Sequence, residues 1–179
     1  MLLNDGRVLV AGGENEKSVA LSSAEIYDPA TALWTTTGSM NTGRIGFTLS
    51  LLRDGNALAV GGYNDCQPCN YLKSTDLYDP SSGTWAPGGD LTVGRSGHAA
   101  ARLPGGKLLV SGGFDGNAAT ASVEVYDPTH QAWATVGPMR SKRSAHTMTR
   151  LRDGRMLVTG GDNGFDVAYK SAELGTTSP

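Results

Sequence analysis

The sequence predicts an all-β fold, a partial β-propeller ring of about four four-stranded blades of which the first and last are incomplete. The first observation is a repeat. A glycine pair that ends an apolar run starts at residues 12, 61, 112 and 160, so successive copies advance by 49, 51 and 48 residues. The second observation is composition, because 25 glycines in 179 residues and 18% charged residues suit short strands joined by tight turns. The third is that no stretch carries a helical apolar period of helix length.

The first three copies carry the same landmarks in the same order: Gly-Gly, then Tyr-Asp-Pro, then one Trp, then one Arg; the fourth begins with Gly-Gly and stops before any Trp. We expect the Tyr and Trp rings to be largely buried between neighbouring blades. We expect the glycine pairs to allow close backbone approach near the crowded axis. The structural repeat positions are Gly12, Gly13, Gly61, Gly62, Gly112, Gly113, Gly160 and Gly161, with Tyr27, Tyr78 and Tyr126, and with Trp34, Trp85 and Trp133.

Four strands, a to d, are predicted in each complete copy. Strand a precedes an Asp-Gly turn such as Asp54-Gly55, which tolerates the positive φ of a tight hairpin. Strand b ends in Gly-Gly, strand c ends at Tyr, and strand d carries the Trp. In the first copy these strands fall at residues 7–11, 23–27 and 33–36, and strand a of the next copy covers 46–52. One blade cannot bury both faces alone, so neighbouring blades must stack on it.

The copies occupy approximately residues 1–44, 45–95, 96–143 and 144–179 and are predicted to form one partial domain. The first has only Met1-Leu2-Leu3 of strand a. The last has Leu174-Gly175-Thr176 in place of Tyr-Asp-Pro and has no strand d. An open arc leaves stacking faces and strand edges bare. We therefore expect the remaining blades of a longer chain, or self-association, to close the ring.

The motifs, in this order and over almost the whole chain, resemble the kelch repeat. The first copy, from Asp5-Gly6 to Trp34, looks like bacterial kelch proteins and is similar to the propeller of galactose-oxidase-like enzymes. The resemblance implies a kelch-type β-propeller, which is a scaffold with many uses.

Strand alternation places the b–c and d–a loops on one face. The b–c loops are long and differ between copies (14–22, 63–74, 114–122 and 162–171), and variable loops on a repetitive frame commonly carry binding. In kelch adaptors of ubiquitin ligases, the Arg at this motif position lines the peptide pocket and holds acidic side chains. By resemblance, Arg44, Arg95 and Arg143 are candidate ligand-binding residues. Alternatively, each pairs with an acidic residue that recurs on strand c and so holds the blades together. These acidic residues are Glu25, Asp76, Glu124 and Glu173.

The favoured function is a non-catalytic module that recognises a protein, a peptide or another acidic ligand on this face. No catalytic residue, cofactor or metal site is assigned. Two alternatives follow from the resemblance: a fragment of a galactose-oxidase-like copper oxidase, or of a sialic-acid mutarotase-like kelch enzyme whose Arg side chains bind a carboxylate. Copper sites of the first kind use Tyr and His ligands and a Tyr–Cys crosslink, and this chain has no Tyr-His dipeptide.

The histidine and cysteine residues give few further candidates for a functional site. His98 and His146 each lie three residues after a repeat Arg, but Phe47 holds the same position, which favours packing over metal binding. Cys66 and Cys69 lie in the longest b–c loop and could form a disulfide, a redox pair or half of a zinc site, although no second Cys pair exists. A disulfide is preferred and implies an oxidising compartment, such as outside the cell, while free thiols fit a cytosolic protein.

The charge balance bears on the class of partner. The formal net charge of −2 gives no reason to expect a nucleic acid or an anionic membrane surface as partner. The apolar runs are of strand length, and none is long enough to span a bilayer.

Overall fold

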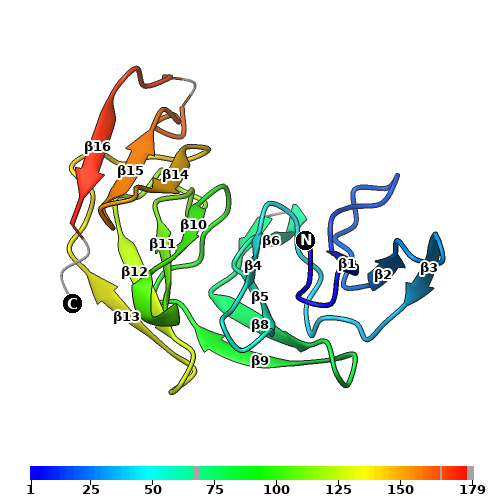
Figure 1. Ribbon diagram of the computed structural model, residues 1–179. Coiled ribbons are helices and arrows are strands. Elements are labelled where there is room, and N and C mark those ends of the chain that lie inside the picture. Colours follow the sequence, from blue (N-terminus) through cyan, green and yellow to red (C-terminus); the bar gives the residue numbers. More distant parts are fainter. Residues whose placement is uncertain (67–68, 166, 177–179) are drawn as a thin grey trace.

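A computed structural model describes residues 1–66, 69–165 and 167–176, with the backbone alone at 65 and 66. Figure 1 shows small antiparallel sheets of three or four strands that follow one another in an open arc, each forming one blade. Apart from strands, regular structure in the described residues is limited to one 3-10 turn at Pro104–Gly106. The predicted all-β partial propeller with incomplete first and last blades is confirmed.

The blades follow the predicted a-to-d order. Blade 1 contains β1 (Val8–Ala11), β2 (Ala24–Asp28) and β3 (Leu33–Thr36), and blade 2 contains β4 (Thr48–Leu51), β5 (Ala57–Val60), β8 (Ser74–Asp79) and β9 (Thr84–Asp90). Blade 3 contains β10 (Ala99–Arg102), β11 (Leu108–Ser111), β12 (Val123–Asp127) and β13 (Ala132–Val136), and blade 4 contains β14 (Thr147–Arg150), β15 (Met156–Thr159) and β16 (Ala172–Gly175). The innermost strands β4, β10 and β14 line the concave side of the arc (Figure 1).

The hydrophobic core is divided between the blade junctions. Because side chains alternate along a strand, each blade sends one set toward the preceding blade and the other toward the following blade. At the first junction, Leu9 and Ile26 of blade 1 pack with Ala57 and Tyr78 of blade 2, and each is at most 3% exposed. The second junction joins Leu52, Leu58, Val60 and Leu91 of blade 2 to Leu108, Val110 and Tyr126 of blade 3. The blades are therefore stabilised by each other, since each large apolar side chain buried there contributes about 1.5–3 kcal/mol.

The repeat tryptophans are less buried than expected from their recurrence in the sequence. Each stacks on the Tyr of its own blade, with ring centroids 5.0 Å apart for Tyr27–Trp34, 5.0 Å for Tyr78–Trp85 and 5.1 Å for Tyr126–Trp133. Trp85 Nε1 also donates to the carbonyl of Gly38, 2.9 Å away in the segment that leaves blade 1. Trp85 and Trp133 are half-buried, but Trp34 is 54% exposed. The predicted burial is wrong for Trp34, because no described blade precedes blade 1 to cover it.

The glycine pairs have a specific steric role. The first glycine of each pair has φ between +60° and +66°, a left-handed conformation that strains other residues. In the first three pairs, a ring from the following blade also lies over this glycine. A Cβ on Gly12 would meet the Phe47 ring at 2.6 Å, and a Cβ on Gly61 would meet the Arg95 carbonyl at 2.6 Å and His98 Cε1 at 3.2 Å. The motif thus allows the next blade to lie directly on the end of strand b.

This arrangement makes a testable distinction between two glycines in the same register. Gly61 and Gly160 have φ values of +60° and +66°, but a Cβ on Gly160 would meet nothing within 4 Å. Gly160→Ala should lower the free energy of unfolding by about 1–3 kcal/mol from backbone strain alone. Gly61→Ala should cost about 1–3 kcal/mol more, because it adds overpacking against blade 3. Urea denaturation measures both, and equal losses would contradict the steric role.

Candidate protein-interaction face

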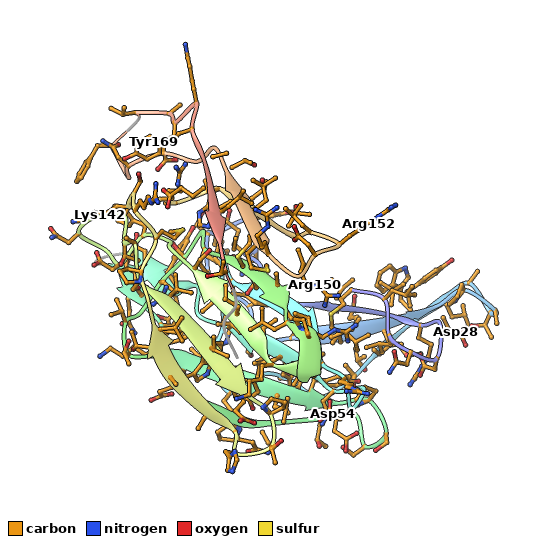
Figure 2. The ribbon with its side chains drawn as sticks, turned by 60° about the vertical axis from the view of Figure 1, so that its left-hand side comes forward. Asp28, Asp54, Lys142, Arg150, Arg152 and Tyr169 are labelled. Carbon is orange, nitrogen blue, oxygen red and sulfur yellow. The ribbon has the colours of Figure 1, made fainter. Side chains whose placement is uncertain are left out.

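The loops at the two ends of the strands define two faces. Figure 2 shows Lys142 and Tyr169 on one side of the blades and Asp54, Arg152 and Asp28 on the other. We call the first side the loop face, formed by the b–c loops and the d–a segments. We call the second side the turn face, formed by the a–b and c–d turns. The division agrees with the strand alternation predicted from the sequence.

The three repeat arginines are buried in ion pairs. The pairs are Arg44 with Asp76 (N–O 2.8 Å), Arg95 with Glu124 (2.6 Å) and Arg143 with Glu173 (3.1 Å). All three Arg side chains are 0% exposed, and the ring of Tyr169 lies 4.9 Å from the guanidinium carbon of Arg143. The acid belongs to strand c of the blade that follows the Arg. Glu25 is accordingly exposed and makes no ion pair with a repeat Arg in the described chain.

Each repeat Arg links two blades through its backbone and its side chain. The Arg44 carbonyl accepts from the backbone N–H of Gly13 in blade 1 at 2.8 Å. Its Nη1 donates to the carbonyls of Gly61 and Ser74 in blade 2, both at 2.8 Å, and its Nε and Nη2 donate to Asp76. The same pattern recurs at Arg143, and at Arg95 with the difference that Nε donates to the Val93 carbonyl and Nη2 alone donates to Glu124. This burial leaves the guanidinium groups no surface for a ligand, and it favours the structural alternative over the expected ligand role.

The residues that follow each repeat Arg form the inner rim of the loop face. Ile45 pairs with Tyr63, and Ser96 pairs with Phe114 in the next blade's b–c loop. The rim continues from blade to blade, because the Gly97 N–H donates to the carbonyl of Gly46 at 3.1 Å. The Ala145 N–H donates in turn to the carbonyl of Gly97 at 2.8 Å. The rim is thus a hydrogen-bonded backbone frame from which the b–c loops project.

An aromatic cluster lies on this frame and was not predicted. The b–c loop of blade 2 forms a hairpin of β6 (Tyr63–Cys66) and β7 (Cys69–Tyr71), where the sequence suggested only a loop. Tyr71 lies between Tyr63 and Phe114, with ring centroids 5.9 Å and 5.6 Å away. All three rings are half-buried, and burial raises the pKa of Tyr71. The aromatic residues Tyr63 and Tyr71, eight positions apart in the same b–c loop, were the available sequence signal.

The cysteine prediction lies only partly within the described atoms. Cys69 is disulfide-bonded, and its backbone stands in register with that of Cys66 across the β6–β7 hairpin. The side chain of Cys66 lies outside the described residues. The Cys66–Cys69 disulfide therefore stays a prediction.

The two register histidines lie at blade junctions. His98 Nε2 is 2.9 Å from Thr48 Oγ1 of blade 2, and His146 Nε2 is 2.9 Å from Ser111 Oγ of blade 3. Burial, reinforced by the Arg95 charge, lowers the pKa of His98 to about 3. Burial and the Arg143 charge lower the pKa of His146 to about 4. These contacts fit the packing role expected for both residues.

No group of three or more His, Cys, Asp or Glu side chains in the described ranges is placed to hold a metal ion. The same part of the chain has no helix of the length and apolarity needed to cross a membrane.

The family model described as the KLHDC2/KLHL20/DRC7 Kelch-repeats domain matches residues 1–172. Spermatocyte protein spe-26 of Caenorhabditis elegans is 30% identical over 117 residues, which cover 63% of this chain and 20% of that protein. F-box/kelch-repeat protein SKIP20 of Arabidopsis thaliana is 33% identical over 109 residues, covering 55% of this chain and 26% of that protein. Human Kelch-like protein 25 is 39% identical over 80 residues, covering 44% of this chain and 12% of that protein.

These relatives refine the expected resemblance. The chain spans only between 12% and 26% of the length of the three relatives. They come from animals and a plant, so the comparisons give no support to a bacterial origin or to a particular likeness to galactose oxidase. The kelch resemblance itself is confirmed by the match over residues 1–172.

Proposed function

The chain belongs to the Kelch-repeats domain family, and we propose from this premise that it is a non-catalytic module that binds a protein partner on its loop face. The observation that carries the proposal is the cluster of Tyr63, Tyr71 and Phe114. Partners of this class are consistent with the kelch-repeat relatives, and kelch propellers serve as scaffolds for binding sites.

The cluster has the properties of an interface anchor. Aromatic side chains are enriched among the few residues that dominate binding energy, because they bury a large area with little loss of rotamer freedom. Tyr71 contacts rings from blade 2 and blade 3, so its position is fixed by two loops at once. The half-buried rings remain partly accessible, which distinguishes them from the wholly buried repeat arginines.

We further propose that the partner segment is acidic, and we assign this preference to lysines instead of the repeat arginines. The loop-face lysines are exposed and make no ion pair within the described residues. They are Lys17, Lys73, Lys142 and Lys170. Of the acids on the same face, Asp115 is held within its own loop, since its Oδ1 accepts from the backbone N–H groups of Asn117 and Ala118, both at 2.9 Å. Charge complementarity of this kind favours correct orientation and fast association.

The test is a selection of 12-residue peptides from a displayed library on the 179-residue chain. Peptides that bind should lose affinity by about tenfold or more for Tyr71→Ala, because removing an aromatic anchor typically costs about 2 kcal/mol or more. Tyr71→Phe keeps the ring and should retain most of the affinity. Enrichment of Asp and Glu in the selected peptides would support the acidic preference.

The control lies on the opposite face. Asp54→Asn changes an exposed residue of the turn face and should leave peptide affinity unchanged. Thermal unfolding of each variant separates lost binding from lost folding. Peptides that bind the Tyr71→Ala chain as tightly as the parent chain would overturn the proposed anchor.

A further inference from the structure

A second polar site lies on the turn face, away from the proposed partner site. A pocket of about 380 Å³ is bordered by the guanidinium-bearing side chains of Arg53, Arg102 and Arg150, by Asn4, and by the turn at 103–106. Arg102 and Arg150 are the last residues of the innermost strands β10 and β14. Figure 2 shows Arg150 and Arg152 toward the side of Asp54, opposite Lys142.

The arginines reach from blade to blade around the inner end of the turn face. Arg102 Nη1 lies 3.4 Å from the Leu51 carbonyl in blade 2, and Arg150 Nη1 lies 3.5 Å from the Arg102 carbonyl in blade 3. A Cβ on Gly106 would meet the Arg53 side chain at 3.3 Å, so Arg53 lies against the turn of blade 3. Three cationic side chains from three consecutive blade segments therefore border one pocket.

No carboxylate among the described residues is paired with these three arginines, and the sequence explains why. The a–b turns of the other copies carry Asp5, Asp54 and Asp153, but the third copy has Gly105 at that position. The existing carboxylates are held within their own turns. Asp5 pairs with Arg7 and Asp153 with Arg155, both at 2.7 Å, and Asp54 accepts from Asn56 at 3.0 Å.

Five other arginines of the chain provide a useful contrast. Each repeat Arg is paired with a carboxylate, which is buried for Arg44 and Arg95 and 14% exposed for Arg143, and Arg7 and Arg155 are paired with an exposed one. Arg53, Arg102 and Arg150 are exposed, border a pocket and have no such partner in the described chain. Their charge is available for a ligand, and it does not contribute a buried ion pair to the fold.

We propose that this turn-face pocket binds a phosphate monoester. Three adjacent positive charges match a phosphate group, which carries about −1.5 to −2 charges near neutral pH, better than a single carboxylate. Guanidinium groups bind phosphate oxygens in a planar, bidentate manner. The phosphate belongs either to a phosphorylated side chain of a protein segment or to a small organic phosphate, and the chemistry of recognition is the same. The site lies on the face opposite the aromatic cluster and is independent of the proposed protein-binding function.

Calorimetric titration of the 179-residue chain with three probes tests the proposal: an N-acetylated, C-amidated Gly-phosphoserine-Gly tripeptide, phenyl phosphate, and the unphosphorylated tripeptide. The two phosphate probes should bind at physiological ionic strength, and the unphosphorylated tripeptide should not. Arg102→Gln and Arg150→Gln should each weaken phosphate binding by about tenfold or more, since each change removes charge-assisted hydrogen bonds to the phosphate. Tighter binding of the phosphotripeptide identifies a protein segment as the source, and tighter binding of phenyl phosphate identifies a small molecule.

The matched control is Arg155→Gln, which removes an exposed guanidinium that is already paired with Asp153 near the same face. It should leave the phosphate affinity within about twofold, because its charge lies outside the pocket lining and is screened at this ionic strength. The proposal is overturned if neither phosphate probe binds. It is also overturned if Arg155→Gln weakens binding as much as Arg102→Gln, since binding would then depend on overall charge and not on the pocket. Thermal unfolding should show that these exposed positions do not alter folding.

Discussion

Glu124→Gln is expected to lower the free energy of unfolding by about 3–5 kcal/mol, because it leaves the buried Arg95 charge uncompensated. Both side chains are 0% exposed, and Arg95 Nη2 lies 2.6 Å from Glu124 Oε1. Burial already lowers the pKa of Arg95, and the Glu124 charge opposes that shift. Glu124 Oε2 also accepts the backbone N–H of Thr92 at 2.8 Å. Removing the carboxylate thus weakens the connection between blades 2 and 3, and urea denaturation at neutral pH measures the loss.

The matched control is Asp153→Asn, which removes a carboxylate from an exposed Arg–Asp pair. The Arg155 and Asp153 side chains are 47% and 49% exposed, so water replaces the lost contact and the free energy of unfolding should change little. The double change Arg95→Met with Glu124→Leu should recover part of the loss, since it removes both charges together. If Glu124→Gln were as mild as Asp153→Asn, the ion pair would not be what holds these blades together.

The fold could be predicted because the signal is repeated. Gly-Gly, Tyr-Asp-Pro, Trp and Arg recur in register, so each copy independently supports the same four-stranded unit. The degree of Trp burial could not be predicted equally well, because it depends on what lies beside each blade. Trp34 and Trp85 share a register position, but only Trp85 belongs to a blade that follows another described blade, against which its ring can pack.

The repeat arginines show where a family resemblance and the local packing diverge. Their recurrence beside a recurring strand-c acid was visible in the sequence, and both a ligand role and a pairing role were consistent with it. Which of these two roles the Arg side chains have depends on how deeply they are buried and on which copy supplies the acidic partner. Arg44 reaches forward to Asp76 because the chain enters blade 2 directly after Arg44, with its guanidinium directed at the end of strand c.

The aromatic cluster and the turn-face arginines depend on contacts between copies. Tyr71 and Phe114 belong to different b–c loops whose sequences and lengths do not repeat. Arg53, Arg102 and Arg150 occupy two different register positions and meet only because adjacent blades bring their a–b turns together. The sequence of a single copy therefore predicts neither the aromatic cluster nor the turn-face pocket.

Acidification from pH 7.5 to 5 is expected to destabilise the fold through His98 and His146. In the folded chain the pKa is about 3 for His98 and about 4 for His146, whereas an unfolded His has a pKa of about 6.5. Because the folded pKa values are depressed, the unfolded chain binds more protons as pH falls below about 6.5, and stability is lost progressively down to the folded pKa. Each His then contributes a loss of about 2 kcal/mol at pH 5, since one pH unit corresponds to about 1.36 kcal/mol.

The pH interval and the choice of variant make this prediction specific. Carboxylates with lowered pKa, such as Asp127 at about 2, affect stability mainly at still lower pH, so the loss between pH 7.5 and 5 reports chiefly on histidine. Phe47 occupies the same register in blade 2, which makes His98→Phe a substitution that this fold already accommodates. We expect His98→Phe to remove about half of the acid-induced loss and His98→Phe with His146→Phe to remove most of it. Urea denaturation at both pH values gives the difference. An undiminished loss in the double variant would mean that the blade-junction histidines are not the groups that titrate.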